Sequence, residues 1–225
     1  MFKLRLIVSA LILLLLSACA SSPEKQKLDT YQSDNADVYF VPIGNMSDKY
    51  KLELLAHFEK TFPLKFSFTP YLKLRKGMID PKTRQVFADK ILQYLDKDFG
   101  SYSDNEKAIY IAVTHVDMRT SKESEAATVT DHKDGRFAVV ANRRMMPQLT
   151  GSVLLINIDT VLANTRKMIS RNIGMLYYNK PANNDPKSVL YRKLTSVQIL
   201  DNMQEQSVFR DILKTKLSRS NSFHN

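Results

Sequence analysis

The sequence predicts an α/β sandwich with a mixed β-sheet, and the order of its apolar patterns is the main reason. Residues 38–43 and 108–114 are short apolar runs rich in β-forming residues, which is typical of strands buried on both faces. Between these runs, and again after residue 158, apolar residues recur at the 3.6-residue spacing of amphipathic helices. Strands and helices that alternate in this way indicate helices packed on a sheet.

The first half of the domain alternates strands and helices along the chain. After the first strand, Ser47 or Asp48 is suited to cap a helix, and Pro63 ends that helix. Residues 64–68 alternate apolar and polar side chains, which predicts a half-exposed strand. Residues 71–83 are punctuated by proline and glycine and predict a loop before the second helix.

The second half ends in two helical patterns. Residues 119–133 are polar and predict a long loop or an irregular edge, whereas residues 136–141 predict a strand and residues 153–156 a possible further one. A long amphipathic helix begins near residue 159, and residues 194–217 predict another amphipathic helix.

The first residues have the pattern of an export signal. Lys3 and Arg5 precede an apolar run over residues 6–16, and small residues then lead to Cys19. This order is typical of a secretory signal peptide, and the run is short for a membrane span. The sequence around Cys19 resembles a bacterial lipobox, which implies that Cys19 becomes the lipid-carrying first residue of the mature protein.

These patterns divide the chain into four parts. We expect a lipoprotein signal peptide over residues 1–18, a lipid-anchored flexible tether over 19–36, one folded domain over 37–217 and a polar tail over 218–225. Ala20 follows the cysteine where an aspartate would stand in lipoproteins kept at the inner membrane. By resemblance to sorted lipoproteins of bacteria with two membranes, Ala20 implies the outer membrane, facing the periplasm.

Composition narrows the possible partners. Cys19 is the only cysteine, which excludes disulfides and cysteine-rich metal sites. The formal net charge is +10 and stays strongly positive after the signal peptide is removed, which suits anionic headgroups or an acidic peptide or protein. No basic cluster is dense enough to indicate nucleic acid, and the export signal also argues against it.

The long helix carries two different stripes. The stripe opposite the apolar one holds Lys167, Arg171, Gly174 and Tyr178, and it predicts a solvated face. Gly174 interrupts the regular pattern and would let the chain turn back sharply there. The apolar stripe predicts the buried face and consists of Val161, Leu162, Thr165, Met168, Ile169, Ile173 and Leu176.

Residues 167–177 resemble the zinc helix of the metzincins, H-E-x-x-H-x-x-G-x-x-H, with every zinc-binding letter changed. When Gly174 is placed on the glycine of that pattern, its three histidines fall on Lys167, Arg171 and Tyr177, and its glutamate falls on Met168. The alternative is an ordinary surface helix with basic residues on its exposed face.

Further segments resemble the archaemetzincins, compact zinc peptidases of the metzincin class. Residues 38–44 match the family's V-Y-x-V-P opening strand, and residues 83–89 match its R-x-Q-[YF]-x-A segment with the spacing altered by one. Residues 114–117 match T-x-V-D, and residues 137–140 match its A-V-V strand. The resemblance implies a zincin-like sandwich with a mixed sheet and a long degenerate active-site helix.

Residues 185–191 resemble the D-P-x-S-V-M-Y form of the Met-turn, which passes beneath the metal in metzincins. Leu190 stands where the methionine would be, and its similar volume would preserve the packing. The alternative is a proline loop that leads into a helix.

The departures from the family pattern exclude its zinc chemistry. Lys167 and Arg171 are cations, Met168 cannot act as a general base, and Tyr177 is a weak ligand as a neutral phenol. No His-x-x-x-His or Glu-x-x-His pair occurs elsewhere. We therefore expect no metal, no cofactor and no zinc peptidase activity.

Three functions remain open at this point. The first is a pseudopeptidase that binds a peptide or protein partner in the cell envelope, with Lys167 and Arg171 receiving an anionic group. The second is an envelope structural or assembly factor that uses the fold only as an interaction surface. The third is a hydrolase with a non-zinc site, for which the candidate residues are His115 with Asp117, or His132 with Asp131 and Asp134.

The lipobox prediction has a direct test. If Cys19 carries the lipid, Cys19→Ser abolishes labelling by a radioactive fatty acid and leaves the precursor uncleaved or soluble. Incorporation of label at the normal level into Cys19→Ser would refute the prediction. Ser17→Ala, which changes a hydroxyl nearby without removing the thiol, serves as the matched control.

Overall fold

The structure is a computed structural model that describes residues 35–120, 130–133, 135–146, 158–194, 196–208 and 212. The signal peptide, Cys19, most of the tether, the possible strand at 153–156 and the polar tail lie outside these residues. Within the described part, no helix is long and apolar enough to cross a membrane.

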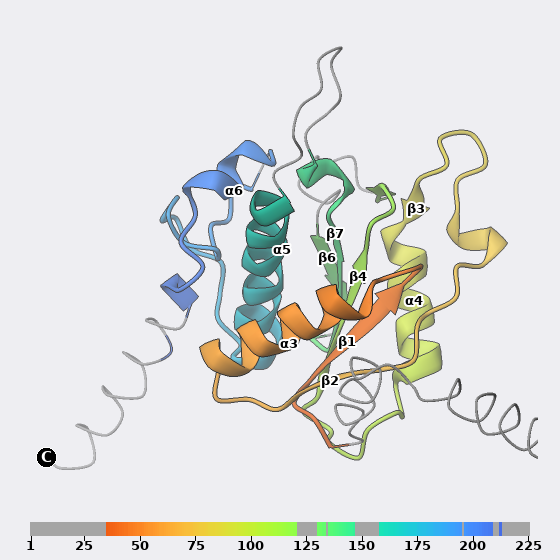
Figure 1. Ribbon diagram of the computed structural model, residues 1–225, viewed down its shortest axis with the longest axis horizontal. Coiled ribbons are helices and arrows are strands. Elements are labelled where there is room, and N and C mark those ends of the chain that lie inside the picture. Colours follow the sequence, from red (N-terminus) through yellow and green to blue (C-terminus); the bar gives the residue numbers. More distant parts are fainter. Residues whose placement is uncertain are drawn as a thin grey trace, which may run out of the picture.

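A five-stranded sheet of order β2-β1-β4-β7-β6 forms the centre of the fold (Figure 1). Four strands are parallel, and β6 pairs with β7 in the antiparallel direction at one edge. The sheet is therefore mixed, as the sequence predicts. Its strands are β1 Val38–Ile43, β2 Phe66–Phe68, β4 Ile109–Thr114, β6 Thr130–Lys133 and β7 Phe137–Ala141; β3 Val86–Phe87 and β5 Met118–Arg119 form a separate two-stranded sheet.

Helices cover both faces of the sheet because the strands bury side chains on both sides. In β1, Val38 and Phe40 enter one hydrophobic cluster, and Tyr39 and Val41 enter the other. The first cluster lies beneath α3 Asp48–Thr61 and α5 Ile158–Asn172, and the second beneath α4 Ala88–Phe99. The remaining helical elements are η2 Lys76–Met78, η4 Arg143–Met145, the π-helix η5 Ile173–Tyr177 and α6 Gln198–Asn202.

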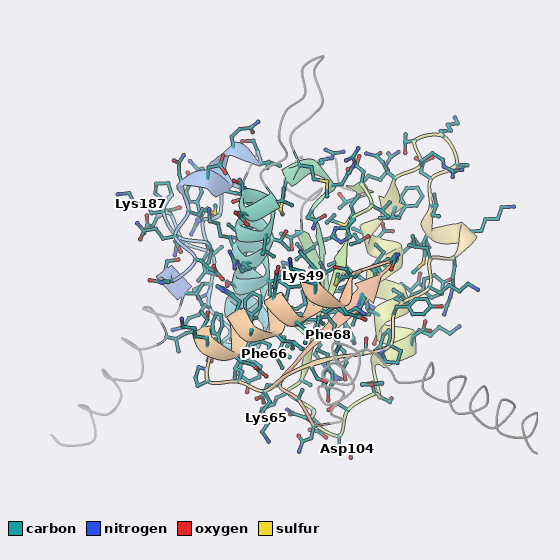
Figure 2. All side chains as sticks on the ribbon, in the orientation of Figure 1. Lys49, Lys65, Phe66, Phe68, Asp104 and Lys187 are labelled. Atoms are coloured by element: carbon teal, nitrogen blue, oxygen red, sulfur yellow. The ribbon has the colours of Figure 1, made fainter. Side chains whose placement is uncertain are left out.

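The strand β2 is fully buried, so the expectation of a half-exposed strand is wrong. Phe66 lies beside α3, with its ring centroid 5.7 Å from that of Phe58 (Figure 2). Ser67 points to the opposite side and is also buried. The alternation of Phe and Ser reflects two covered faces, since a serine is small enough to be buried beside an apolar cluster.

Several local predictions are confirmed. The side chain of Ser47 caps α3 by accepting a hydrogen bond from the backbone N–H of Tyr50 at 3.3 Å. All residues of the predicted apolar stripe of the long helix are buried. The helix begins at Ile158, close to the predicted start.

The predicted helix at 194–217 is largely wrong over the part that can be compared. Among the described residues there, α6 is helical and Ser207, Val208 and Ile212 are helical again, but the two stretches are separated, and Met203 has an extended backbone. Gln204 forms a β-bridge with Ser188, and its N–H donates to the carbonyl of Lys187 at 2.7 Å. The apolar residues at helical spacing are buried because this short, bent segment packs on α5, so the periodicity did not require a continuous helix.

The chain does not turn back at Gly174, contrary to the sequence prediction. The α-helical pattern ends at Asn172, but the π-helix η5 carries the chain on to Tyr177. Gly174 is needed for close packing instead, because a Cβ there would lie 3.0 Å from Val208 Cγ1 and 3.2 Å from Leu190 Cδ2. The stripe that holds Gly174 is therefore covered by the C-terminal segment, residues 183–208, and is not a solvated face.

This packing predicts the sign of two glycine substitutions. We expect Gly174→Ala to lower the free energy of unfolding by about 1–3 kcal/mol, because the added methyl group overpacks the contact with Val208 and Leu190. Gly77→Ala, where a Cβ meets nothing within 4 Å, is the control and should be neutral or stabilising by about 0.4–1 kcal/mol. Urea unfolding measures both, and equal effects would contradict the packing argument.

Candidate functional site

Arg171 connects α5 to the turn at residues 185–191. Its Nη1 donates to the carbonyl oxygen of Val189 at 2.7 Å and to that of Tyr191 at 3.0 Å. These two residues flank Leu190, which is buried against Gly174. Burial lowers the pKa of Arg171, but an arginine side chain stays protonated in proteins. A partly buried cation thus holds the turn against the helix.

Lys167, one turn earlier on α5, makes a second connection of the same kind. Its Nζ donates to the carbonyl oxygen of Leu200 at 2.6 Å and to Asn164 Oδ1 at 3.2 Å. Burial lowers the pKa of Lys167, while Asp201 and Glu205 act in the opposite direction. Both cations of the candidate anion site therefore already donate to groups of the protein itself.

The turn at residues 185–191 is compact and closed by its own backbone. The N–H of Ser188 donates to the carbonyl of Asp185 at 3.0 Å, and the N–H of Tyr191 donates to that of Ser188 at 3.0 Å. The N–H of Asn183 reaches the carbonyl of Leu190 at 2.9 Å. The side chain of Leu190 is buried and lies against Gly174 of η5.

Met168 and Tyr177 do not join the two cations. Met168 is fully buried in the cluster beneath α3 and α5. The hydroxyl of Tyr177 donates to Asp37 Oδ1, 3.1 Å away at the start of β1, and burial together with this carboxylate raises the pKa of Tyr177 to about 12. Tyr177 is thus bonded to the start of β1, whereas Lys167 and Arg171 are bonded to the C-terminal segment.

This set of residues does not fit a zinc ion. A catalytic zinc site needs three nitrogen, oxygen or sulfur ligands and an open position. The pattern positions instead hold two cations, one core thioether and one phenol that is bonded elsewhere. Over the whole described part of the chain, no three His, Cys, Asp or Glu side chains are grouped so that they could hold a metal.

Comparison with known proteins identifies the fold but no sequence family. No family model and no curated protein matches the chain. Three solved structures match with probability 1.00. The fold is that of the archaemetzincins.

The archaemetzincin of Archaeoglobus fulgidus, in complex with malonate, has a TM-score of 0.56 at 18% identity, over 75% of this chain and 92% of its own. The archaemetzincin of Methanopyrus kandleri has a TM-score of 0.58 at 14% identity, over 81% of this chain and 98% of its own. A zinc-dependent peptidase of Methanocorpusculum labreanum has a TM-score of 0.54 at 12% identity, over 75% of this chain and 94% of its own. This chain therefore contains nearly the whole archaemetzincin-like fold.

The first candidate for a non-zinc hydrolase site is not assembled in this archaemetzincin-like domain. His115 Nδ1 lies 2.9 Å from Asn142 Oδ1, whereas Asp117 accepts hydrogen bonds from Gln85 at 2.7 Å and from Arg144 at 2.8 Å. Burial acts to raise the pKa of Asp117, but Arg144 and Gln85 hold it below its usual value. His115 and Asp117 thus have separate partners.

The second hydrolase candidate lies on the edge strand β6. His132 is exposed there, and its backbone N–H donates to Asp131 Oδ1 at 2.9 Å. Asp134 lies outside the described residues. This contact between neighbouring residues of β6 uses the backbone N–H of His132, and the imidazole takes no part in it.

One polar cluster has no motif in the sequence. Glu205 Oε1 accepts a hydrogen bond from Ser170 Oγ at 3.0 Å and lies 2.7 Å from His57 Nε2. These residues come from the C-terminal segment, α5 and α3, so the cluster joins three elements at one carboxylate. The sequence places Ser170 on the long helix but cannot predict the cluster, because the three residues are far apart along the chain.

The role of Arg171 in this domain can be tested by removing its charge. We expect Arg171→Met to lower the free energy of unfolding by about 1–3 kcal/mol, because two backbone carbonyls lose their donor. Arg192→Met is the control, since the Arg192 side chain is exposed and its hydrogen bond to the carbonyl of Ala182 is long, at 3.5 Å; we expect this variant to change the free energy of unfolding by less than about 0.5 kcal/mol. An Arg171→Met variant as stable as its control would show that the cation does not hold the turn.

Proposed function

We propose that this chain is a lipid-anchored envelope protein whose archaemetzincin-like domain is catalytically inactive and acts by binding a peptide or protein partner. The observation that carries the proposal is the hydrogen bonding of Arg171. Where the zinc pattern requires its second histidine, this chain has a cation that donates to the carbonyls of Val189 and Tyr191. The position serves the internal structure and not a metal.

The missing chemistry supports inactivity. Hydrolysis of a peptide bond by a zinc enzyme needs the metal to polarise the carbonyl and a base to activate water. Met168 replaces that base and lies in the hydrophobic core, where it has no titratable group and no contact with solvent. Neither step can be assigned to the residues of this helix.

The contacts of the two cations also bear on how a partner would bind. A carboxylate that entered between Lys167 and Arg171 would have to displace the carbonyls of Leu200, Val189 and Tyr191. Capture of an anionic group by Lys167 and Arg171 is therefore the less supported mode. Recognition through the outer surface of the domain, as in an envelope assembly factor, is the candidate that these contacts favour.

The envelope location rests on the sequence alone. The export signal, Cys19 and the polar tether imply a domain held near a membrane, with Ala20 implying the outer membrane facing the periplasm. The positive net charge is compatible with an acidic partner or an anionic membrane surface.

The proposal of inactivity is tested by metal content and hydrolysis together. We expect the purified chain to contain no stoichiometric zinc by mass spectrometry, to show no change of melting temperature on addition of zinc, and to cleave no peptide from a mixed library. The peptidase of Methanocorpusculum labreanum, purified in the same way, is the positive control. Malonate, which is bound to the Archaeoglobus fulgidus protein, serves as a probe of the cation pair and should give no binding signal.

Stoichiometric zinc with peptide cleavage would overturn the pseudopeptidase proposal. Malonate binding that is lost in Lys167→Met would instead restore the anion-binding mode at this pair. In cells, a protein cross-linked to the intact chain and absent from Cys19→Ser would identify the envelope partner. A chain that cross-links to no protein in intact cells would contradict the binding function.

A further inference from the structure

The loop over residues 71–84, here called the basic loop, is the most strongly charged exposed segment in the described fold. It joins β2 to β3 and extends away from the central sheet at one end of the molecule (Figure 1). Five of its residues are cationic, Lys73, Arg75, Lys76, Lys82 and Arg84, and Asp80 is its only acid.

The inner side of the basic loop is fixed to the fold. Leu72 is buried, forms a parallel bridge with Ile43, and donates its N–H to the carbonyl of Pro42 at 2.8 Å. Met78 is fully buried in the cluster beneath α4. The loop is therefore held in one conformation by buried contacts.

Two ion pairs remove charge from this inner side. Arg75 pairs with Asp98 of α4, and its guanidinium lies 4.1 Å from the centre of the Tyr94 ring. Asp80, the only acid of the loop, pairs with Arg119 at 2.7 Å. The only acid of the loop is thus neutralised by a residue outside the loop. The loop has no other acid that could pair with its remaining four cations.

The exposed part of the loop contains these four cations and an aromatic ring. Lys73, Lys76, Lys82 and Arg84 are exposed, and no described residue forms an ion pair with any of them. Tyr71 is 65% exposed and is the large hydrophobic side chain most open to solvent among the described residues. Tyr71 and Lys73 flank Leu72 in extended chain, so both project to the side opposite the buried leucine.

A hollow of about 440 Å³ lies beside this tyrosine, where β1 ends. Its lining consists of Gly44, Asn45, Tyr71, Leu72, Lys73 and Leu74. The hollow combines apolar walls, one lysine and one amide side chain. Such a surface can receive a group that is anionic at one end and apolar at the other.

We propose that the basic loop and Tyr71 dock the domain on an anionic phospholipid surface. Lysines close to a membrane are attracted by anionic headgroups, and tyrosine is favoured at the boundary between headgroups and hydrocarbon. The fixed backbone presents both features together, and the single acid of the loop is already paired. Docking in the cell rests on the proposed function, in which a lipid anchor holds the domain near a membrane. Binding of the loop to an anionic surface does not itself require that anchor.

The test uses residues 20–225, which retain every described residue and both hydrophobic clusters. Binding is measured by co-sedimentation with vesicles of phosphatidylcholine alone and of phosphatidylcholine mixed with phosphatidylglycerol. We expect binding only to the mixed vesicles, and we expect it to weaken as salt is added. The triple variant Lys73→Gln, Lys76→Gln, Lys82→Gln should lose at least about tenfold in affinity, since each cation near the surface contributes roughly fivefold.

The control triple variant is Lys49→Gln, Lys107→Gln, Lys187→Gln, which has the same net charge. These lysines are exposed and lie outside the basic loop. Lys49 is in the first turn of α3, and Figure 2 shows Lys187 at the left edge of the molecule. We expect the affinity of this control variant for the mixed vesicles to lie within about twofold of that of the unchanged chain. Arg84 is left unchanged in both variants because its φ of 62° makes a substitution harder to interpret.

A fluorescent reporter locates the contact. The chain contains no tryptophan, so Tyr71→Trp introduces a single one. Its emission should shift to shorter wavelength with the mixed vesicles and not with phosphatidylcholine alone. Lys187→Trp should show no shift with either.

Three outcomes would overturn the inference. These are equal losses in the two triple variants, an unshifted Tyr71→Trp emission, or binding of the loop to polyglutamate with none to the mixed vesicles. The last outcome would assign the loop to an acidic protein. Failure of acyl labelling at Cys19 would remove the proposed anchor without affecting any of these measurements.

Discussion

The contact between α5 and the C-terminal segment is the constraint on which one face of this fold depends. Arg171 and Lys167 donate to carbonyls of that segment, and Ser170 donates to Glu205. A metal ion can join a helix to a neighbouring turn by coordination, but here charged side chains make that connection through hydrogen bonds. Lys167 and Arg171 are cations that donate to backbone carbonyls, and Ser170 donates to a carboxylate, so the connection is made within the chain itself.

Packing reinforces this connection at one point. Gly174 permits Leu190 and Val208 to approach the helix more closely than a Cβ usually allows. The carboxylate of Glu205 reaches from the same segment to His57 on α3. The C-terminal segment therefore couples the two helices that cover one face of the sheet, and a change at any of these contacts is expected to affect the others.

The distribution of charge separates an internal region from an external one. Near α5 the cations are partly buried and bonded, whereas those on the outer side of the basic loop are exposed. If the domain is inactive, as proposed, it can still act through such a surface. In that proposal the archaemetzincin-like fold holds the basic loop and its exposed tyrosine in place.

Local patterns in the sequence were sufficient for the central strands β1, β4 and β7 and for the buried face of α5. The strands β1 and β4, the Ser47 cap and the buried stripe of α5 were predicted because each depends on neighbouring residues and a fixed period. The resemblance of residues 167–177 to a zinc helix also came from spacing alone. So did the absence of zinc ligands at those positions.

Only the tertiary structure decided what the other stripe of α5 contacts. Lys167 and Arg171 read as solvated cations in the sequence, because the carbonyls that accept from them lie 18 to 33 residues away along the chain. The buried Ser67, the helix that continues through Gly174 and the short α6 were missed for the same reason. Each is set by a surface that another part of the chain supplies, and periodicity within one segment contains no information about that surface.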